Sequence, residues 1–428
     1  MPSPETPQPA PVARPIDSTP ERAKAFEILR RARKDRALGA EVFAAELRGL
    51  GPDVIEPLLD VLFAHEVPPV QPDETHQTLS IEQREILLAT LSSFHAARTL
   101  HSAELRLAAQ PSAVARVAGL WVYSAVGDVP ELARAVQLAH VERETKLPAK
   151  CEEAFRAAVT KILVRNPAGF SGLSGLVLRA PPELHRPFVF AIGDTRDPRG
   201  QETFARLLTF REDLVDVTVA QCRLLGPPLE PEVREELGRV LEPLLDSTAP
   251  QLCAAACRAL GEIENENSIP RLIELLESTE LTVRENALWA LKRCSRLNLP
   301  PRAEAWSRWF REMQAWWDER AHGLFVDLRD GQRLERMLAL EELGRVAIYR
   351  DEITDHVTPL LSDGDVLVRR RACDTLHALG MRSAAPALLT ALEDSDGEVR
   401  AKARGALEAL LARTLPDDPS ECRRLLKL

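Results

Sequence analysis

Long apolar runs and strand-forming residues are scarce in this chain of 428 residues. No apolar run approaches the roughly 18–20 residues that a membrane-spanning helix requires, so we expect no membrane insertion. Aromatic residues make up only 5% of the sequence, whereas 45% of it is hydrophobic, with alanine and leucine prominent. Such a composition is typical of helices that bury an apolar stripe. The sequence therefore predicts an all-α protein.

Cysteine is present without any pairing pattern. No CxxC pair occurs, and the seven cysteines lie mostly among apolar helix residues: Cys151, Cys222, Cys253, Cys257, Cys294, Cys373 and Cys422. This distribution is typical of reduced thiols that pack as small apolar side chains in a cytosolic protein. The first twenty residues hold seven prolines and no continuous apolar segment of the kind found in signal peptides. We therefore predict a cytoplasmic protein with a disordered tail at residues 1–20.

An excess of positive charge is also missing. The chain has 55 Lys and Arg against 65 Asp and Glu, a formal net charge of −10. Proteins that coat nucleic acid need cationic side chains against the phosphates. The charge balance therefore disfavours nucleic acid as the main partner, although it leaves room for a local basic strip.

A repeat stands out near the C-terminal end. The stretch Asp363–Glu393 is followed by a second copy that begins at Asp394, and each matching position recurs 31 places later. The matching positions of the first copy are Asp363, Asp365, Val368, Arg369, Ala372, Leu376 and Leu379, and those of the second are Asp394, Asp396, Val399, Arg400, Ala403, Leu407 and Leu410. A fixed period of 20–50 residues indicates a solenoid of stacked units.

Each repeated position has a physical reason. The aspartates can cap the helix that follows by accepting its free amide hydrogens. Gly380 stands where a helix end favours left-handed backbone, and Pro386 falls in the first turn of the next helix, where its missing amide costs nothing. Weaker copies occur upstream, and blocks near residues 36–67, 80–110, 111–142 and 147–180 each predict a helix, a turn and a helix.

The string D-x-D-x-x-V-R-x-x-A-x-x-x-L-x-x-L-G, followed by a proline and a leucine-rich helix, resembles the HEAT repeat, and in particular the bacterial HEAT-like repeats of phycobilin lyase subunits. The resemblance covers residues 181–414 well and reaches back weakly to residue 36. It implies an α-solenoid of about ten stacked antiparallel helix pairs. It also implies that the repeated charged residues bond from one repeat to the next: Asp365, Asp396, Arg284, Arg369 and Arg400.

We predict six segments along the chain. They are the tail at residues 1–20, degenerate helix pairs at 21–180, HEAT repeats at 181–301, an inserted Trp-rich helix at 302–320, further HEAT repeats at 321–415, and a C-terminal cap or tail at 416–428. The inserted helix contains Trp306, Trp309, Trp316 and Trp317 at helical spacing, which favours packing onto the solenoid, with an aromatic anchor for a partner as the alternative. The basic stretch Glu21–Arg36 predicts a capping helix with a solvated polar side. The proline-bearing stretch Val67–Thr78 predicts a disordered loop.

A search for chemistry in the sequence finds no complete site. His65-Glu66 is a single His-Glu dyad, whereas the di-iron deoxyhypusine hydroxylases, which share the HEAT fold, use several such dyads. Cys253 and Cys257 share a helix face without further metal ligands nearby, and the glycine-rich stretch Gly169–Gly175 lacks the lysine of a phosphate-binding loop. We therefore predict no catalytic, cofactor-binding or metal-binding residues, and the sequence leaves the partner-binding residues unknown.

These observations favour a non-catalytic scaffold that binds a protein partner through the inner surface of the solenoid, where the second helices of the pairs lie. One alternative is an enzyme or lyase subunit on a HEAT-like fold, either similar to a bilin lyase or similar to a DNA glycosylase that would use the tryptophans and Asp318. Another is nucleic-acid binding through a local basic strip. The sequence identifies neither the partner nor the oligomeric state.

Overall fold

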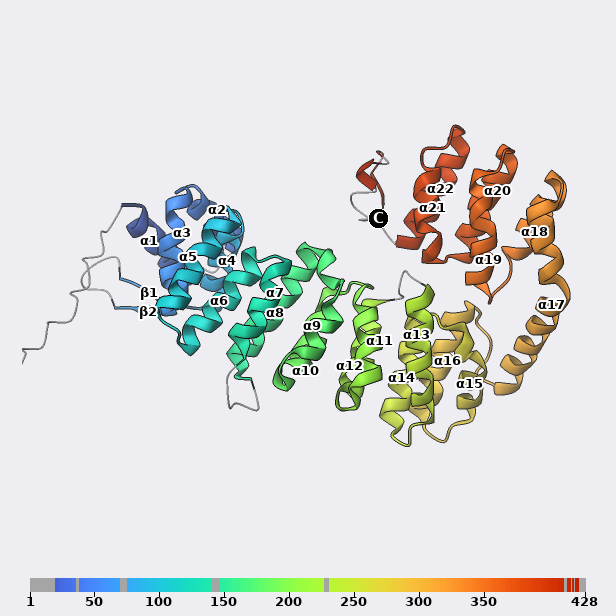
Figure 1. Cartoon of the computed structure of the whole chain (residues 1–428), viewed down its shortest axis with the longest axis horizontal. Helices are drawn as coiled ribbons and strands as arrows, with labels where there is room; N and C mark the ends of the chain where they lie inside the picture. The colour runs from blue at the N-terminus through green and yellow to red at the C-terminus, as the bar shows by residue number, and fades with distance from the viewer. Residues whose placement is uncertain are drawn as a thin grey trace, which may run out of the picture. The chain divides into compact units, whose positions relative to one another are not determined.

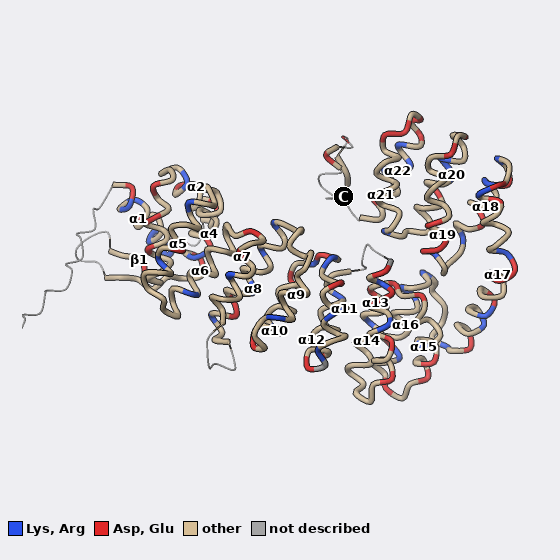
Figure 2. Tube along the Cα trace, viewed as in Figure 1, with Lys and Arg blue, Asp and Glu red and all other residues tan. Residues whose placement is uncertain are grey.

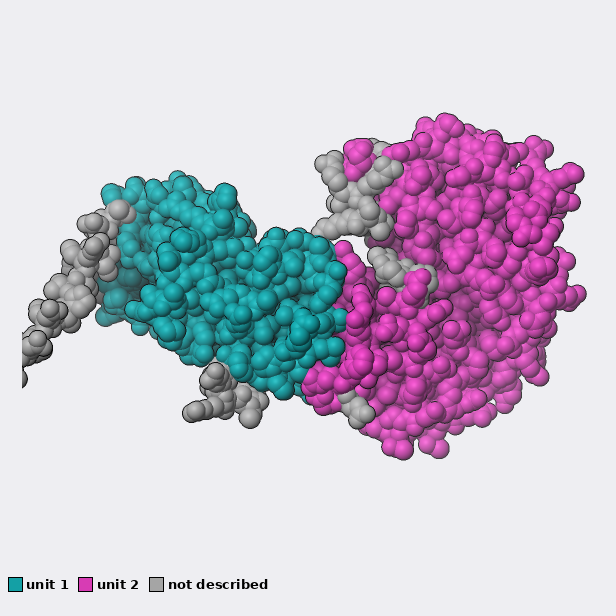
Figure 3. Space-filling model, in the orientation of Figure 1, with its two compact units in different colours: residues 1–191 teal, residues 192–428 magenta. Residues whose placement is uncertain are grey.

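Antiparallel helix pairs make up nearly all of the chain in the computed structural model (Figure 1). The structure describes residues 20–35, 38–69, 75–140, 147–226, 231–411, 414–416, 418 and 420–422. The chain forms two compact units, residues 1–191 and residues 192–428 (Figure 3). Each unit is treated by itself below. The predicted tail, except Pro20, and most of the predicted C-terminal segment lie outside the described residues.

The N-terminal unit is a stack of helix pairs preceded by one capping helix. First helices pack on first helices along the stack, as α2, α4, α6 and α8 do. The elements are α1 (Pro20–Lys34), α2 (Ala40–Arg48), η1 (Pro52–Val54), α3 (Ile55–Ala64), β1 (Glu66–Val67), β2 (Gln77–Thr78), α4 (Ile81–Leu91), α5 (Ala96–Ala109), α6 (Ala113–Val126), α7 (Val129–Ala139), α8 (Ala149–Arg165), η2 (Pro167–Phe170), α9 (Leu173–Arg179) and α10 (Pro182–Thr195). The four helix-turn-helix blocks expected between residues 36 and 180 are all present.

The prediction of a disordered loop at Val67–Thr78 is wrong for the two ends of that stretch, which form a short hairpin. Strands β1 and β2 pair antiparallel, with Glu66 opposite Thr78. The buried guanidinium of Arg30 on α1 donates hydrogen bonds to the carbonyl oxygens of Pro68 (2.9 Å) and Thr75 (2.6 Å). Residues 70–74 lie outside the described part of the chain. Arg30 therefore belongs to the packed side of α1, although the sequence placed the basic residues of this helix in solvent.

The C-terminal unit continues the same arrangement with more regular repeats. Its elements are α11 (Gly200–Phe210), η3 (Glu212–Leu214), α12 (Val215–Leu225), α13 (Pro231–Leu241), η4 (Glu242–Asp246), α14 (Pro250–Glu262), η5 (Glu266–Ser268), α15 (Ile269–Glu274), η6 (Leu275–Glu277), α16 (Leu281–Ser295), α17 (Ala303–Asp330), α18 (Arg333–Leu343), α19 (Arg350–Val357), η7 (Thr358–Ser362), α20 (Val366–Leu379), η8 (Arg382–Ala384), α21 (Ala385–Ala391) and α22 (Gly397–Leu411). Together with the pairs of the first unit, these helices give the predicted all-α solenoid.

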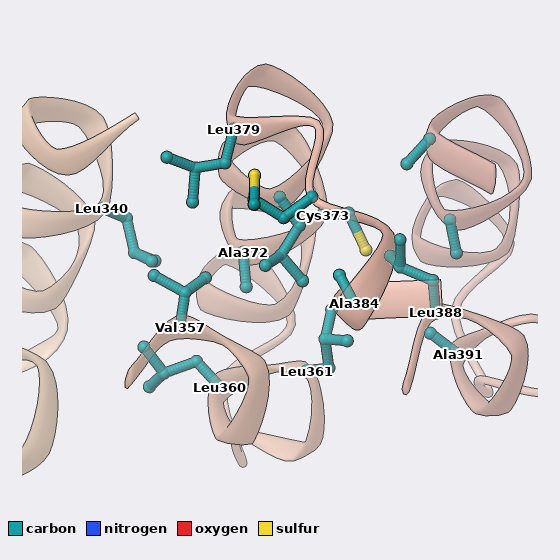
Figure 4. Close-up of a cluster of buried hydrophobic side chains, with 14 of the residues drawn as sticks. Leu340, Val357, Leu360, Leu361, Ala372, Cys373, Leu379, Ala384, Leu388 and Ala391 are labelled. Carbon is teal, nitrogen blue, oxygen red and sulfur yellow. The ribbon is translucent and has the colours of Figure 1, made fainter. Parts of the chain in front are cut away.

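The punctuation of the repeat behaves as the sequence predicts. Asp365 accepts a hydrogen bond from the amide of Leu367 (2.9 Å) and so caps α20. Gly380 ends that helix with a φ of 62°, in the left-handed region, and Pro386 lies in the first turn of α21. Between these markers the apolar stripes of neighbouring repeats meet in one continuous core (Figure 4). In Figure 4, Val357 and Leu361 from the preceding pair point toward Ala372 and Ala384.

The tryptophan-rich helix α17 is longer than its sequence suggested, because it continues past residue 320 to Asp330. Its N-terminal part packs against α15, and the helix also packs against α18 and α19. Leu324 and Leu328 in its last turns are buried in the core of the C-terminal repeats. One helix thus serves both as the insertion and as a partner of the next repeat. The exact division into six segments stays a prediction.

Candidate functional site

The N-terminal unit contains a cavity of about 570 Å³. Its walls come from the C-terminal end of α3, the start of α4, one side of α6 and the first turn of α8. The side chains of Leu62, Leu79 and Val117 make the walls predominantly aliphatic. Ile81 and Val114, which also line the cavity, are 63% and 50% exposed. The cavity therefore opens to solvent along an aliphatic rim.

Cationic side chains surround this cavity. The guanidinium of Arg84 lies 4.0 Å from the ring centroid of Trp121 and donates a hydrogen bond to Glu153 (2.9 Å). Arg116 and Lys150 line the same cavity and have no ion pair with any residue that the structure describes. Three cations thus face one carboxylate, in a chain whose net charge is −10. The cavity is a local basic site on an acidic protein.

His65 connects the cavity to one of the sequence predictions. It ends α3 with left-handed backbone (φ 58°) and lines the cavity, whereas Glu66 is directed to the hairpin, where its carboxylate lies 3.4 Å from His76 Nδ1. Burial, and then the positive charges of Lys150 and Arg84, lower the pKa of His65. The imidazole is therefore neutral at pH 7. The structure separates the two members of the His65-Glu66 dyad.

An exposed apolar face lies on α18 in the C-terminal unit. Leu334 and Leu338 are four residues apart and are 66% and 57% exposed. When Leu343 is aligned with Leu379, the equivalent positions on α20 are Arg370 and Asp374. Both of these are paired with the next repeat, Arg370 with Asp396 directly before α22 (2.6 Å) and Asp374 with Lys402 on α22 (2.7 Å). The α18 helix thus presents leucine where the next repeat uses charges for bonding between repeats.

In the C-terminal unit, the second helices of the pairs contact one another through charged side chains. The guanidinium of Arg350, at the start of α19, is 1% exposed and donates to Glu266 Oε1 (2.8 Å) and to the carbonyl of Cys294 (2.7 Å). Arg234 on α13 forms an ion pair with Asp351. These bonds join α19 to α13, η5 and the end of α16. The second-helix surface expected to bind a partner is therefore used here for internal contacts.

Charged residues bond from repeat to repeat in part as the resemblance implied. Arg369 donates two hydrogen bonds to Asp394 of the next repeat (2.8 and 3.0 Å), and Asp396 accepts a hydrogen bond from Arg370 (2.9 Å). Asp365 lies 3.7 Å from Arg333 of the preceding repeat. Arg284 and Arg400 instead donate to carbonyl oxygens of their own preceding turns, at Ser278 and Asp394. The reason is positional: α17 follows the repeat of Arg284, and α22, which carries Arg400, has no repeat after it among the described residues.

The tryptophans of α17 are packed to different degrees. Trp306 is fully buried and its indole N–H donates to the carbonyl of Pro300 (3.0 Å). Trp317 stacks on Tyr349 with ring centroids 4.1 Å apart. Trp309, Trp316 and Trp317 are half-buried, and Trp316 packs with Trp317 against the core of the C-terminal repeats. These contacts support the packing interpretation for Trp306, Trp316 and Trp317.

The other residues considered for chemistry have structural surroundings. All seven cysteines are free and buried, and burial raises the pKa of Cys222 to about 12. The stretch Gly169–Gly175 forms the end of η2 and the start of α9, with Gly172 in left-handed backbone (φ 76°). Within the described ranges, no three His, Cys, Asp or Glu side chains gather to hold a metal ion. No described helix is long and apolar enough to cross a membrane.

Sequence reasoning did not find the cavity. Arg84, Arg116 and Lys150 lie on three different helices and form no motif along the chain. The available signal was indirect, since each of them lies close to the start of a predicted helix. The exposed leucines of α18 could have been found by aligning Leu343-Gly344 with Leu379-Gly380, because that alignment places Leu334 and Leu338 at polar positions of the neighbouring repeat.

A comparison with protein families agrees with this architecture. Residues 238–303 and 324–420 match HEAT repeats. No curated protein matches the chain. The fold is therefore an all-α solenoid. Over the matched residues, more specifically, the chain is a HEAT-repeat protein.

Solved structures match this chain at low identity and low TM-score. An engineered protein is 15% identical over 92% of this chain and 99% of its own, with a TM-score of 0.33. Human deoxyhypusine hydroxylase in complex with glycerol is 17% identical over 58% of this chain and 100% of its own, with a TM-score of 0.23. A mutant of Kap121p is 12% identical over 82% of this chain and 41% of its own, with a TM-score of 0.34. At these TM-scores the three structures carry no argument about what this chain does.

Proposed function

We propose that this chain is a non-catalytic scaffold or adaptor that binds a protein partner in the cytoplasm, and that the leucine face of α18 belongs to the binding surface. The observation that carries the proposal is the exposure of Leu334 and Leu338 at positions where the following repeat has paired charges. Adjacent exposed apolar side chains on an otherwise charged surface are typical of protein–protein contact sites. A repeat solenoid presents such a face on a rigid stack.

The charge pattern supports a protein partner over nucleic acid. Acidic and basic residues alternate along α17 (Figure 2), and Arg336 next to the leucine face is paired with Asp363 (2.9 Å). A phosphate backbone would be repelled by the carboxylates of such a surface. The alternatives on a HEAT-like fold, a bilin lyase-like or DNA glycosylase-like enzyme, find no specific support in the contacts of Asp318 or the tryptophans.

Affinity capture from the native cells tests the proposal. The intact chain is compared with a Leu334→Gln/Leu338→Gln variant, and Leu281→Gln on α16, where the leucine is 57% exposed, is the matched control. Loss of a specific partner from the double variant, with capture by Leu281→Gln unchanged, is the expected result. Identical capture by all three proteins, with all of them folded, would remove the α18 face from the proposal. The variants Trp309→Ala and Trp316→Ala report in the same assay whether these half-buried rings take part.

A further inference from the structure

We propose that the cavity of the N-terminal unit binds a small amphipathic anion, a carboxylate carried on an unbranched aliphatic body. This inference is independent of the proposed scaffold function, because it concerns another surface and another class of ligand. The cavity volume of about 570 Å³ falls within the roughly 300–1,000 Å³ of small-molecule sites. The walls contributed by Leu62, Leu79 and Val117 offer such a ligand an apolar surface.

The cations of the cavity select the charge of the ligand. Glu153 is already held by Arg84, whereas Arg116 and Lys150 have no carboxylate partner among the described residues. A neutral ligand would desolvate these two cations without pairing them, and a cationic ligand would be repelled. A carboxylate gains charge-assisted hydrogen bonds from both side chains. The neutral imidazole of His65 can add a further hydrogen bond.

The ends of three helices add to the same preference. Ser80, Ala113 and Ala149 stand at the starts of α4, α6 and α8, and all three line the cavity. The N-terminus of a helix carries partial positive charge and amide hydrogens without a partner in the helix. The hydroxyls of Ser80 and Ser112 already accept one such amide each, from Gln83 and Ala115, and the others remain for a ligand. Glu82 and Glu152 lie in the first turns of α4 and α8, but no acidic residue lies in the first turn of α6. The region around Ala113 and Arg116 is therefore the best position for the carboxylate.

The aliphatic rim determines the rest of the ligand. Beside the cavity, Ile81 is 63% exposed and Val114 is 50% exposed. An aliphatic body extending from the carboxylate would cover both side chains. Sugars and nucleotides would leave their hydroxyl groups against aliphatic walls without hydrogen-bond partners. A linear aliphatic carboxylate satisfies both the rim and the cations.

Isothermal titration calorimetry on the full chain tests the inference with defined probes. Hexanoate, octanoate and decanoate form a length series, and octanamide and octylammonium replace the charge at constant length. We expect one site, with affinity rising about fourfold per added methylene. We also expect octanoate to bind at least tenfold more tightly than octanamide, and octylammonium not to bind. Equal affinity of the three octyl probes, or no heat from any carboxylate at millimolar concentration, would overturn the proposal.

Matched variants place the binding in the cavity. Lys150→Met and Arg116→Met should each weaken octanoate binding about threefold to tenfold. Lys24→Met and Arg179→Met remove exposed cations elsewhere in the same unit and should leave it unchanged. Val117→Trp should fill the cavity and abolish binding of all probes. Circular dichroism and thermal unfolding without ligand show that each variant is folded, and octanoate should raise the melting temperature of the wild type but not of Val117→Trp. Unchanged binding by folded Lys150→Met, Arg116→Met and Val117→Trp would refute the site. The site would also be refuted if the cavity bound an acidic leucine peptide and none of the aliphatic carboxylates.

Discussion

The two units are built from the same kind of helix pair, yet they use charged residues differently. In the C-terminal unit, charged residues bond from repeat to repeat, as Arg369 does with Asp394 and Arg336 with Asp363. In the N-terminal unit ion pairs also join neighbouring helix pairs, as Arg106 does with Asp60 and Arg134 with Glu104, but Arg116 and Lys150 have no ion pair with any described residue and lie beside an open cavity. The difference between the units therefore lies at this cavity, where two cations and an unfilled space are available for a ligand.

Each unit has a buried guanidinium that bonds to a distant segment, and that of Arg350 in the C-terminal unit is buried more deeply than that of Arg30 in the N-terminal unit. Arg350 joins α19 to η5 and α16, and its neighbour Tyr349 has left-handed backbone (φ 61°) while donating its amide to Glu266. These bonds hold the last repeats against the middle ones across the insertion of α17. The comparison predicts that single substitutions will affect the C-terminal unit more strongly, and the predictions below test it.

The largest effect should come from Arg350→Met. Removing this guanidinium leaves Glu266 buried without its partner, which costs about 3–5 kcal/mol of unfolding free energy. Denaturant unfolding followed by tryptophan fluorescence reports mainly on the C-terminal unit, because only Trp121 lies in the other one. Arg345→Met removes an exposed ion pair with Glu341 and should change stability by less than about 1 kcal/mol. Equal effects of the two substitutions would show that Arg350 does not join the repeats.

The loss caused by Arg350→Met should depend on pH. Burial raises the pKa of Glu266 even beside Arg350, whose charge lowers it, so removal of Arg350 raises it further. A carboxyl with a raised folded-state pKa is protonated more easily in the folded protein than in the unfolded chain. The destabilisation is therefore complete above that raised pKa and shrinks as the pH falls toward the unfolded-state pKa, about 4.3. A loss that grows on acidification would contradict this account.

A smaller effect is expected at Gly380, where the repeat turn needs left-handed backbone. Its φ is 62°, and an added Cβ would lie 2.3 Å from a guanidinium nitrogen of Arg296. Gly380→Ala should cost about 1–2 kcal/mol from backbone conformation alone, and more if Arg296 loses its bonds to the carbonyls of Ala378 and Gly380. Gly405→Ala in α22, where nothing lies within 4 Å of the added Cβ, should instead stabilise by about 0.4–1 kcal/mol. Thermal unfolding of both variants gives the comparison.

The sequence predicts features that depend on a local turn or on the repeat period, but not those that depend on distant contacts. Gly380, Pro386 and the capping Asp365 were predictable because each has a local physical reason that depends only on its own turn. The Arg369–Asp394 bond was predictable because the period brings the two positions together. The roles of Arg350 and Arg30 were not, since each depends on a contact with a distant segment whose position no local pattern determines.

The cavity was unpredictable for a related reason. It exists because the starts of α4, α6 and α8 do not fill the space beside the end of α3, and an unfilled volume leaves no pattern in a sequence. The length of α17 was missed because the tryptophan spacing ends at residue 317, although the helix is continued by the buried Leu324 and Leu328. Local rules thus gave the helices, while the sites depend on how degenerate repeats pack.

A third prediction concerns acid conditions. The guanidinium of Arg370 lowers the pKa of Asp396 to about 2, and Arg369 lowers that of Asp394. The contribution of these carboxylates to stability is present above their unfolded-state pKa of about 3.9 and is lost as the pH falls toward 2. Carboxyl NMR titration should show the pKa of Asp396 rising toward 3.8 in Arg370→Gln. An unchanged pKa in that variant would show that the ion pair between the repeats is absent in solution.

The smallest expected effect is a change in the pKa of His65, which measures directly the charge of Lys150 in the cavity of the N-terminal unit. Lys150 and Arg84 lower the pKa of His65 after burial has done so, so Lys150→Met should raise that pKa part of the way back toward 6.5. Because folding lowers the pKa of His65, the neutral imidazole supports stability above pH 6.5, and this contribution declines as the pH falls below 6.5. The decline on acidification should be smaller in Lys150→Met than in the wild type. Histidine ring NMR titration measures the shift, with Lys24→Met as the control. If His65 titrates identically in both variants, Lys150 does not face the cavity, and the contrast between a self-paired C-terminal unit and a positively charged N-terminal cavity fails at its central residue.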